Sequence, residues 1–280
     1  MRETAARGAR RVRGFVRLAA LTTIFAAASA HAAEGGLRDF CAHRPGKATP
    51  PCLIDPGHLM VEVDALDLAH TRAAGVTQDA TLLLSPQFRY GLGDRFEVAV
   101  TFAPSQRLRT RDPSGAVSTV SGTGDSQLAL TYSLRNPDGS GTSAALEGFV
   151  GLPTAEHGLG AGGFQGGVVL PLALPLPAGF ALGLSPEVDA LRSPGRGLHP
   201  AYVAAAALSH GLGHAVTGSL ELWASRNEDP AGHVTQATFD ADLAWIPHAR
   251  PNLQLDGGVN LGLDRAAPGV EAYLGVARRF

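Results

Sequence analysis

The sequence lacks a segment that could cross a membrane as a helix, although one uncharged run is long enough. Residues 166–186 read GGVVLPLALPLPAGFALGLSP and carry no charge, and about 20 apolar residues suffice for a helical span. Pro171, Pro175 and Pro177 interrupt this run, and proline breaks a helix interior. Nor does the rest of the chain show a persuasive amphipathic helix, since the alanine-rich segment 201–208 is too short. The run therefore needs a non-helical explanation.

Positive charge is scarce beyond the first 32 residues. Those residues hold six of the 23 basic residues and one of the 25 acidic residues, which leaves residues 33–280 with a net charge of −7. Nucleic acids are polyanions and select basic surfaces. The sequence therefore predicts no nucleic-acid partner.

The first 32 residues have the layout of a secretory signal peptide. Arginines between positions 2 and 17 precede an apolar core, Leu18–Ala28, that is too short to span a bilayer. Ala30-His31-Ala32 then offers an A-x-A cleavage site, with Ala28-Ser29-Ala30 as a second option. An N-terminal anchor is the alternative, although alanine and threonine make this core weakly hydrophobic. We predict that residues 1–32 direct export and are removed.

Cysteine is nearly absent, because Cys41 and Cys52 are the only two. Two lone cysteines in an exported chain are expected to pair. A metal site is the weaker interpretation, since no nearby cysteine completes a four-ligand set and only His43 and His58 flank the pair. We expect a disulfide that closes a proline-rich loop and fixes a periplasmic segment, residues 33–57, against the mouth of the next domain as a partial plug. No cofactor or metal is expected.

From residue 58 onward the hydrophobic pattern repeats every two residues. In Phe96–Phe102 and in Gln127–Arg135, apolar side chains alternate with polar or small ones. Successive side chains of a β-strand point to opposite faces, so each segment has one apolar face. Twelve such segments are expected, at residues 58–69, 80–92, 95–104, 125–135, 142–152, 164–175, 179–190, 200–209, 214–226, 234–246, 252–263 and 269–280.

The connections between these segments alternate in length. Short ones lie at residues 93–94, 136–141, 176–179, 210–213 and 247–251, and longer ones at 105–124, 153–163, 191–199 and 227–233, while residues 71–79 and 264–269 are less clear-cut. An even strand number with this alternation is typical of a barrel that crosses the outer membrane. The sequence thus predicts an all-β fold, a transmembrane antiparallel β-barrel of about twelve strands over residues 58–280. Residues 166–186 would be two lipid-facing strands with their prolines near the rim or turn.

A soluble β-sandwich or lipocalin-like barrel is the alternative, since alternation alone does not separate the two. The last strand favours the membrane barrel. Val270, Ala272, Leu274 and Val276 share a face with the terminal Phe280, and a terminal aromatic on an alternating strand resembles the signal read by the barrel-insertion machinery. Arg278 departs from this face and would have to extend toward the interface. Outer-membrane lipid and the insertion machinery are therefore expected partners.

The polar faces of the predicted strands carry the charged residues. A charge that faces lipid at mid-depth costs about 2–4 kcal/mol, so this face should line the lumen. The residues assigned to it are Glu62, Asp64, Arg89, Arg95, Glu97, Arg135, Glu147, Glu187, Asp189, Glu221, Asp240, Asp242, Asp256 and Glu271. They would either cross-link and hydrate the interior or form an acidic, cation-preferring channel.

Three motifs suggest chemistry, and each has a simpler explanation. Gly158–Gly163 matches GxGxxG but is not followed by the helix that a dinucleotide site requires. Gly124-Asp125-Ser126 resembles an esterase nucleophile block, yet Ser126 begins a predicted strand. Ser209 and His210 are adjacent and would point to opposite faces of a strand. No enzyme activity is expected.

Several stretches together resemble a family of Gram-negative outer-membrane transporters of the phenol-degradation meta-pathway type. They are CAHRPGKATPPC (Cys41–Cys52), GHLMVEVD (Gly57–Asp64), GTGDSQLALTYSLRN (Gly122–Asn136), VGLPTAEHGLGAGG (Val150–Gly163) and the closing GVARRF. The resemblance implies a porin-like barrel that passes small molecules, aromatic or hydrophobic, and it brings no catalytic residues. A structural or assembly barrel with a filled lumen and a membrane-embedded hydrolase remain as alternatives.

Overall fold

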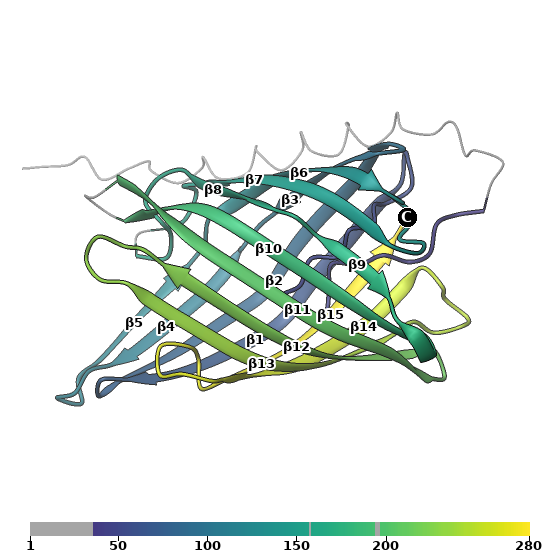
Figure 1. The fold of residues 1–280 in the computed structure, drawn as a ribbon. Helices are drawn as coiled ribbons and strands as arrows, with labels where there is room; N and C mark the ends of the chain where they lie inside the picture. The colour runs from purple at the N-terminus through teal and green to yellow at the C-terminus, as the bar shows by residue number, and fades with distance from the viewer. Residues whose placement is uncertain (1–35, 157, 194–196) are drawn as a thin grey trace, which may run out of the picture. The chain divides into compact units, whose positions relative to one another are not determined.

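The computed structural model describes residues 36–156, 158–193 and 197–280, which form an antiparallel β-barrel (Figure 1). Its strands are β1 (Leu59–Ala73), β2 (Val76–Gly93), β3 (Phe96–Thr101), β4 (Ser105–Arg111), β5 (Val117–Gly122), β6 (Ser126–Arg135), β7 (Ser143–Leu152), β8 (Gln165–Val169), β9 (Leu172–Pro175), β10 (Phe180–Ser193), β11 (Gly197–Gly213), β12 (Val216–Asn227), β13 (Val234–Trp245), β14 (Leu253–Gly262) and β15 (Val270–Arg279). A single 3-10 turn, η1 (Pro177–Gly179), joins β9 to β10. Within these residues, no helix has both the length and the apolar character needed for a membrane span.

The barrel is closed by twelve strands, as the sequence predicted. Three of these twelve wall strands consist of two segments with a short break between them. These segments are β3 with β4, β5 with β6, and β8 with β9. Strand β1 pairs antiparallel with both β2 and β15, so the first and last strands seal the sheet. Among the described residues, every strand of the barrel except β5, which pairs with β4 alone, has a paired neighbour on both sides, as a strand structure needs in lipid.

The two faces of the barrel wall differ in polarity, as the alternation of apolar and polar residues along the sequence predicts. Along β6, Leu128, Leu130 and Leu134 are exposed on the outside, whereas Thr131 and Ser133 are buried. Strand β13 repeats the pattern, with apolar side chains outside and Asp240 and Asp242 inside. The outer surface of the barrel is therefore an apolar belt and the inner surface is polar.

The uncharged run at residues 166–186 forms β8, β9, η1 and the first half of β10, so it is a pair of wall strands joined by a tight turn. Pro175 ends β9 and Pro177 begins the turn, which confirms their predicted place. Pro171 was expected near the rim and instead lies within the wall. The register against β7 does not shift across it, and its carbonyl accepts a hydrogen bond from the Ala145 amide (3.0 Å). Only the missing proline N–H divides β8 from β9.

The two ends of the barrel are built differently. At one end Phe280 and Leu59 exchange backbone hydrogen bonds (2.8 and 3.3 Å), and the connections are short. By the usual arrangement of such barrels this is the periplasmic end, and the opposite one is here called the outer end. The short connection after β2 and the one after β11 lie at the periplasmic end, as predicted.

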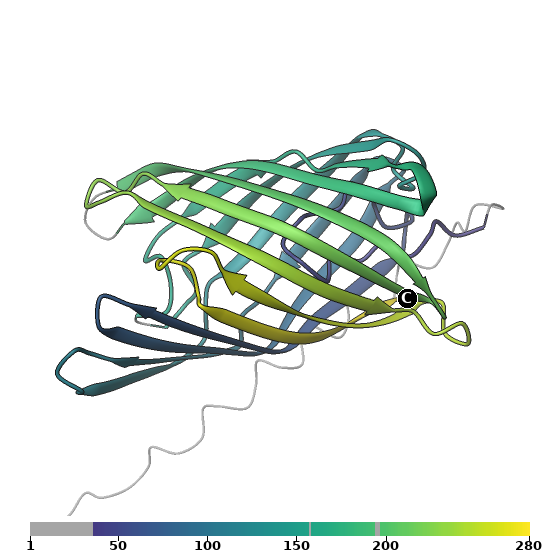
Figure 2. The ribbon, with the colours of Figure 1, turned by 60° about the horizontal axis from the view of Figure 1, so that its bottom comes forward.

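At the outer end, two predicted loops are strands instead. Residues 71–79 extend β1 and β2 into a hairpin whose turn, Ala74-Gly75, has positive φ at both positions (49° and 80°), as a tight two-residue hairpin requires. Residues 105–124 contain the hairpin of β4 and β5 rather than an irregular loop. Figure 2 shows both hairpins at the outer end of the barrel, where the β4–β5 hairpin reaches furthest.

Candidate functional site

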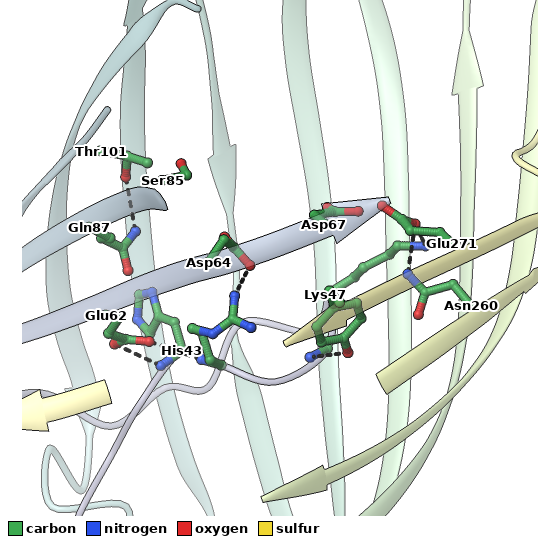
Figure 3. A pocket seen from close by; sticks show the side chains of 13 residues that line it. His43, Lys47, Glu62, Asp64, Asp67, Ser85, Gln87, Thr101, Asn260 and Glu271 are labelled. Carbon is green, nitrogen blue, oxygen red and sulfur yellow. Dashed lines mark hydrogen bonds and ion pairs between the residues drawn. The ribbon is translucent and has the colours of Figure 1, made fainter. Parts of the chain in front are cut away.

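The N-terminal segment lies inside the barrel. Residues 43–49 cross the lumen, where their backbone and side chains contact inward-facing residues of β1, β10, β12 and β15 (Figure 3). Of the segment at residues 33–57 that was expected to act as a partial plug at the periplasmic mouth, residues 43–49 thus lie inside the lumen. We call residues 43–49 the lumen segment.

Arg89 anchors the start of this segment. Its guanidinium is completely buried and lies between two carboxylates, with Nε 2.6 Å from Glu97 and Nη1 2.9 Å from Glu62. The same side chain donates to the backbone carbonyls of Cys41 (2.7 Å) and Cys52 (3.4 Å). One cation thus pairs with two carboxylates within the lumen, which leaves a net negative charge, and the same guanidinium holds the chain that enters the barrel.

Cys41 and Cys52 form a disulfide, as predicted. The loop that it closes begins and ends at the carbonyls bound by Arg89 and is held further by Glu62, which accepts the amides of His43 and Arg44 (both 3.0 Å). Burial, together with the nearby Arg89 guanidinium, holds the pKa of His43 well below its ordinary value. The His43 imidazole is therefore neutral and adds no positive charge to the lumen.

Arg44 and Lys47 project from the lumen segment into separate acidic groups. Arg44 forms ion pairs with Asp64 and, at 2.8 Å, with Asp256. The Lys47 ammonium donates to Thr238 (2.9 Å), lies 3.5 Å from Asp240 and 3.7 Å from Glu271, and sits 4.9 Å from the centre of the Trp223 ring.

The backbone of the lumen segment is held by acids as well. Glu221 accepts the amides of Lys47 (2.9 Å) and Ala48 (2.8 Å), and the Gly46 amide donates to the Tyr273 hydroxyl (3.0 Å). Tyr273 in turn donates to Asp242. The acidic wall therefore binds the N–H groups of the lumen segment in addition to its cationic side chains.

Most of the charged residues assigned to the lumen have contacts or burial consistent with that assignment. Besides those already described, Glu147 accepts from the Thr131 hydroxyl (2.7 Å), and Asp189 is buried. Glu187 shares the inward parity of Ser185, whose hydroxyl donates to the Thr49 carbonyl (3.0 Å). Arg95 and Arg135 were placed wrongly with this group. Arg95 lies in the turn before β3 and Arg135 ends β6, and both are exposed.

The sequence pattern missed several residues that line the lumen. Asp67 lies beside Glu271 in Figure 3, although its parity with Glu62 predicts the opposite face. A bulge at Ala65, seen as a register shift between Asp64 and Leu66, reverses the alternation. Arg44 and Lys47 were missed because they lie in a segment without periodicity.

A cavity of about 280 Å³ remains beside the lumen segment. The residues that line it are nearly all of polar or charged type and include His43, Arg44, Lys47, Asp64, Asp67, Gln87, Thr101, Asn260, Glu271 and Tyr273. Carboxylates outnumber cationic side chains around it. Since the walls are of low dielectric, this excess of negative charge should enrich cations within the lumen and deplete anions.

Phe280, the predicted insertion signal, is exposed at the end of β15 beside the Arg278 guanidinium, which lies 4.7 Å from its ring centre. The neighbouring Arg279 points inward and pairs with Asp55 at 3.1 Å. The exposed position of Phe280 is compatible with recognition, which stays a prediction.

Comparison with solved structures shows the same fold. An outer membrane channel from Pseudomonas putida F1 superimposes with a TM-score of 0.63 at 16% identity, covering 85% of this chain and 99% of the other. The β domain of the Bordetella autotransporter BrkA gives a TM-score of 0.51 at 11% identity, covering 80% and 98%. The sequence matches none of the curated proteins. It does match the family described as "Putative MetA-pathway of phenol degradation" over residues 42–280, nearly the whole described chain, and the protein therefore belongs to that family.

Proposed function

We propose that the protein is an outer-membrane channel that passes small neutral and cationic molecules. The observation that carries this proposal is the acid-lined cavity beside the lumen segment. A twelve-stranded barrel is wider than the eight-stranded kind that side chains fill, and here the extra width holds a chain segment as well as a cavity. The lumen segment narrows the path, so the channel should be small.

The proposed cargo includes small aromatic compounds. The family description supports this, because it names phenol degradation. A cavity of about 280 Å³ also suffices in size, since a 150 Å³ cavity accommodates benzene. The hydroxyl of a phenol would find acceptors among Asp64, Asp67 and Glu271, which line that cavity.

Single-channel conductance in a planar bilayer tests the proposal. The purified protein should produce discrete conductance steps, smaller than those of wide porins because the lumen segment occupies part of the path. The alternative is a structural barrel whose lumen is filled, which the many ionic contacts of the lumen segment favour. A protein that inserts, shows the gel shift of a folded barrel and yet carries no current would support that alternative.

The proposal contains no catalytic step. Ser209 and His210 are neighbours on β11 and point to opposite faces of the sheet. The Ser209 hydroxyl donates weakly to the Ala181 carbonyl (3.5 Å), while the His210 ring stacks on Phe180 with centroids 4.3 Å apart. Hydrolysis of detergent-dispersed phospholipid by the pure protein would overturn this part.

A further inference from the structure

The two outer hairpins present a basic face. The outer parts of strands β1, β2, β4 and β5 pair side by side at the outer end of the barrel, and their register arranges the residues of one face in rows (Figure 2). From the barrel outward the rows read Leu66–Leu83–Ser105, Leu68–Thr81–Arg107–Ser121, His70–Asp79–Arg109–Thr119 and Arg72–Thr77–Arg111–Val117. We call Arg72, Arg107, Arg109 and Arg111 the arginine face.

The arginine face is the outer face of the sheet. Glu271, which faces the lumen, pairs with Ala69 across β15 and β1, so Ala69 points inward. Side chains alternate along a strand, which turns His70 and Arg72 outward. The side-chain contacts agree with a shared outward face, since the Asp79 carboxylate lies 2.7 Å from the His70 ring and 3.2 Å from the Arg109 guanidinium.

Positive charge on this face is mostly unneutralised. Asp79 is the one acid in the rows, and it already contacts Arg109 and His70. Arg72, Arg107 and Arg111 are exposed, and within the described part of the chain none of them has an ion-pair partner. Asp112, at the tip of the hairpin, is engaged by the amides of Ser114 and Ala116 (2.8 and 3.0 Å).

The arginine face continues the apolar belt. Leu66 and Leu83 occupy the row nearest the barrel, and Leu274 of β15 lies opposite Leu66. Alternate residues of a strand are about 7 Å apart, so the surface changes from leucine to arginine within one or two rows. A hollow of about 350 Å³ opens at this boundary, and its lining includes Thr81, Leu83, Ser105, Arg107, Ser121 and Glu156.

We propose that the arginine face binds the phosphate groups of lipopolysaccharide in the outer leaflet. Guanidinium groups match phosphate oxygens in geometry and charge, and basic clusters beside a membrane-spanning region recruit anionic headgroups. The leucine rows would contact the acyl chains of the same molecule, which a soluble anion could not exploit. The inference rests on the proposed outer-membrane location and is independent of conduction.

The test removes the three unpaired arginines together, as Arg72→Gln, Arg107→Gln and Arg111→Gln. The matched control removes three exposed arginines from the periplasmic end, as Arg95→Gln, Arg135→Gln and Arg250→Gln, which changes the net charge equally. Affinity for purified lipopolysaccharide should fall roughly tenfold or more in the first variant and stay unchanged in the control. The heat-dependent gel shift of a folded barrel is required of both.

Two further probes identify the ligand. Dephosphorylated lipopolysaccharide should bind the wild type as weakly as the intact glycolipid binds the triple variant. Inorganic phosphate at millimolar concentration should not displace the glycolipid; full displacement would indicate a site for free anions and overturn the assignment. Equal lipopolysaccharide affinity in all three proteins would also overturn it. Single-channel conductance should be the same in wild type and triple variant, so a failure here is distinct from a failure of the proposed channel.

Discussion

Replacing Arg44 and Lys47 together by alanine should raise the single-channel conductance roughly twofold or more. Arg44 ties the lumen segment to Asp64 and Asp256, and Lys47 ties it to the acids of the opposite wall. Without these ion pairs the segment loses its side-chain attachments and the lumen loses two positive charges. The first change should widen the path, and the second should make the lumen more favourable for cations. The measurement is conductance in planar bilayers at symmetric salt.

Arg265→Ala is a control for charge loss outside the lumen, because Arg265 is exposed in the connection between β14 and β15. It removes a positive charge without touching the lumen and should leave conductance as it is. If the Arg44 and Lys47 variant folds, by its gel shift, and conducts like the wild type, the lumen segment does not restrict the path.

Arg89→Met should lower the free energy of unfolding by about 3–5 kcal/mol. The guanidinium is completely buried between Glu62 and Glu97, so its removal leaves two buried carboxylates without their cation. The carbonyls of Cys41 and Cys52 lose a donor at the same time. Urea unfolding of the protein refolded in lipid vesicles gives the free energy directly.

Two further variants distinguish the effect of burying an ion pair from the effect of leaving buried carboxylates unpaired. Arg226→Met breaks an ion pair with Glu228 whose arginine is 47% exposed, and it should cost under about 1 kcal/mol. Combining Arg89→Met with Glu62→Gln and Glu97→Gln should restore part of the lost stability, because the unpaired charges are then gone. An Arg89→Met protein that unfolds at the wild-type urea concentration would contradict the role given to this cluster.

The barrel itself could be predicted because strands of a membrane barrel have one apolar face. Leu128, Leu130 and Leu134 mark β6 without reference to any other part of the chain. Local alternation also predicted the inward direction of Glu62, Glu97 and most other lumen acids. The outer hairpins were harder, since polar side chains on both faces, as in Gln106–Arg111, resemble a loop.

The lumen segment could not be located from the sequence. Its partners are far away along the chain: the Lys47 amide bonds Glu221 and the Gly46 amide bonds Tyr273, each across more than half of the barrel strands. No periodic pattern signals such contacts. The inward direction of the Asp67 side chain was missed for a different reason, because the bulge at Ala65 shifts the alternation by a single residue. Arg95 was misplaced because it lies in a turn outside any strand, and Arg135 because the register against β7 shifts between Ser133 and Arg135.

The reversal potential across a salt gradient tests the central claim most directly. The lumen acids outnumber Arg44, Lys47 and Arg89, so the wild-type protein should prefer cations at low salt. The preference should weaken as salt rises, since the Debye length shrinks from about 30 Å at 0.01 M to about 3 Å at 1 M. Cation preference that fades with salt is the predicted result. Clear anion preference at low salt would contradict the acid-lined path through the lumen.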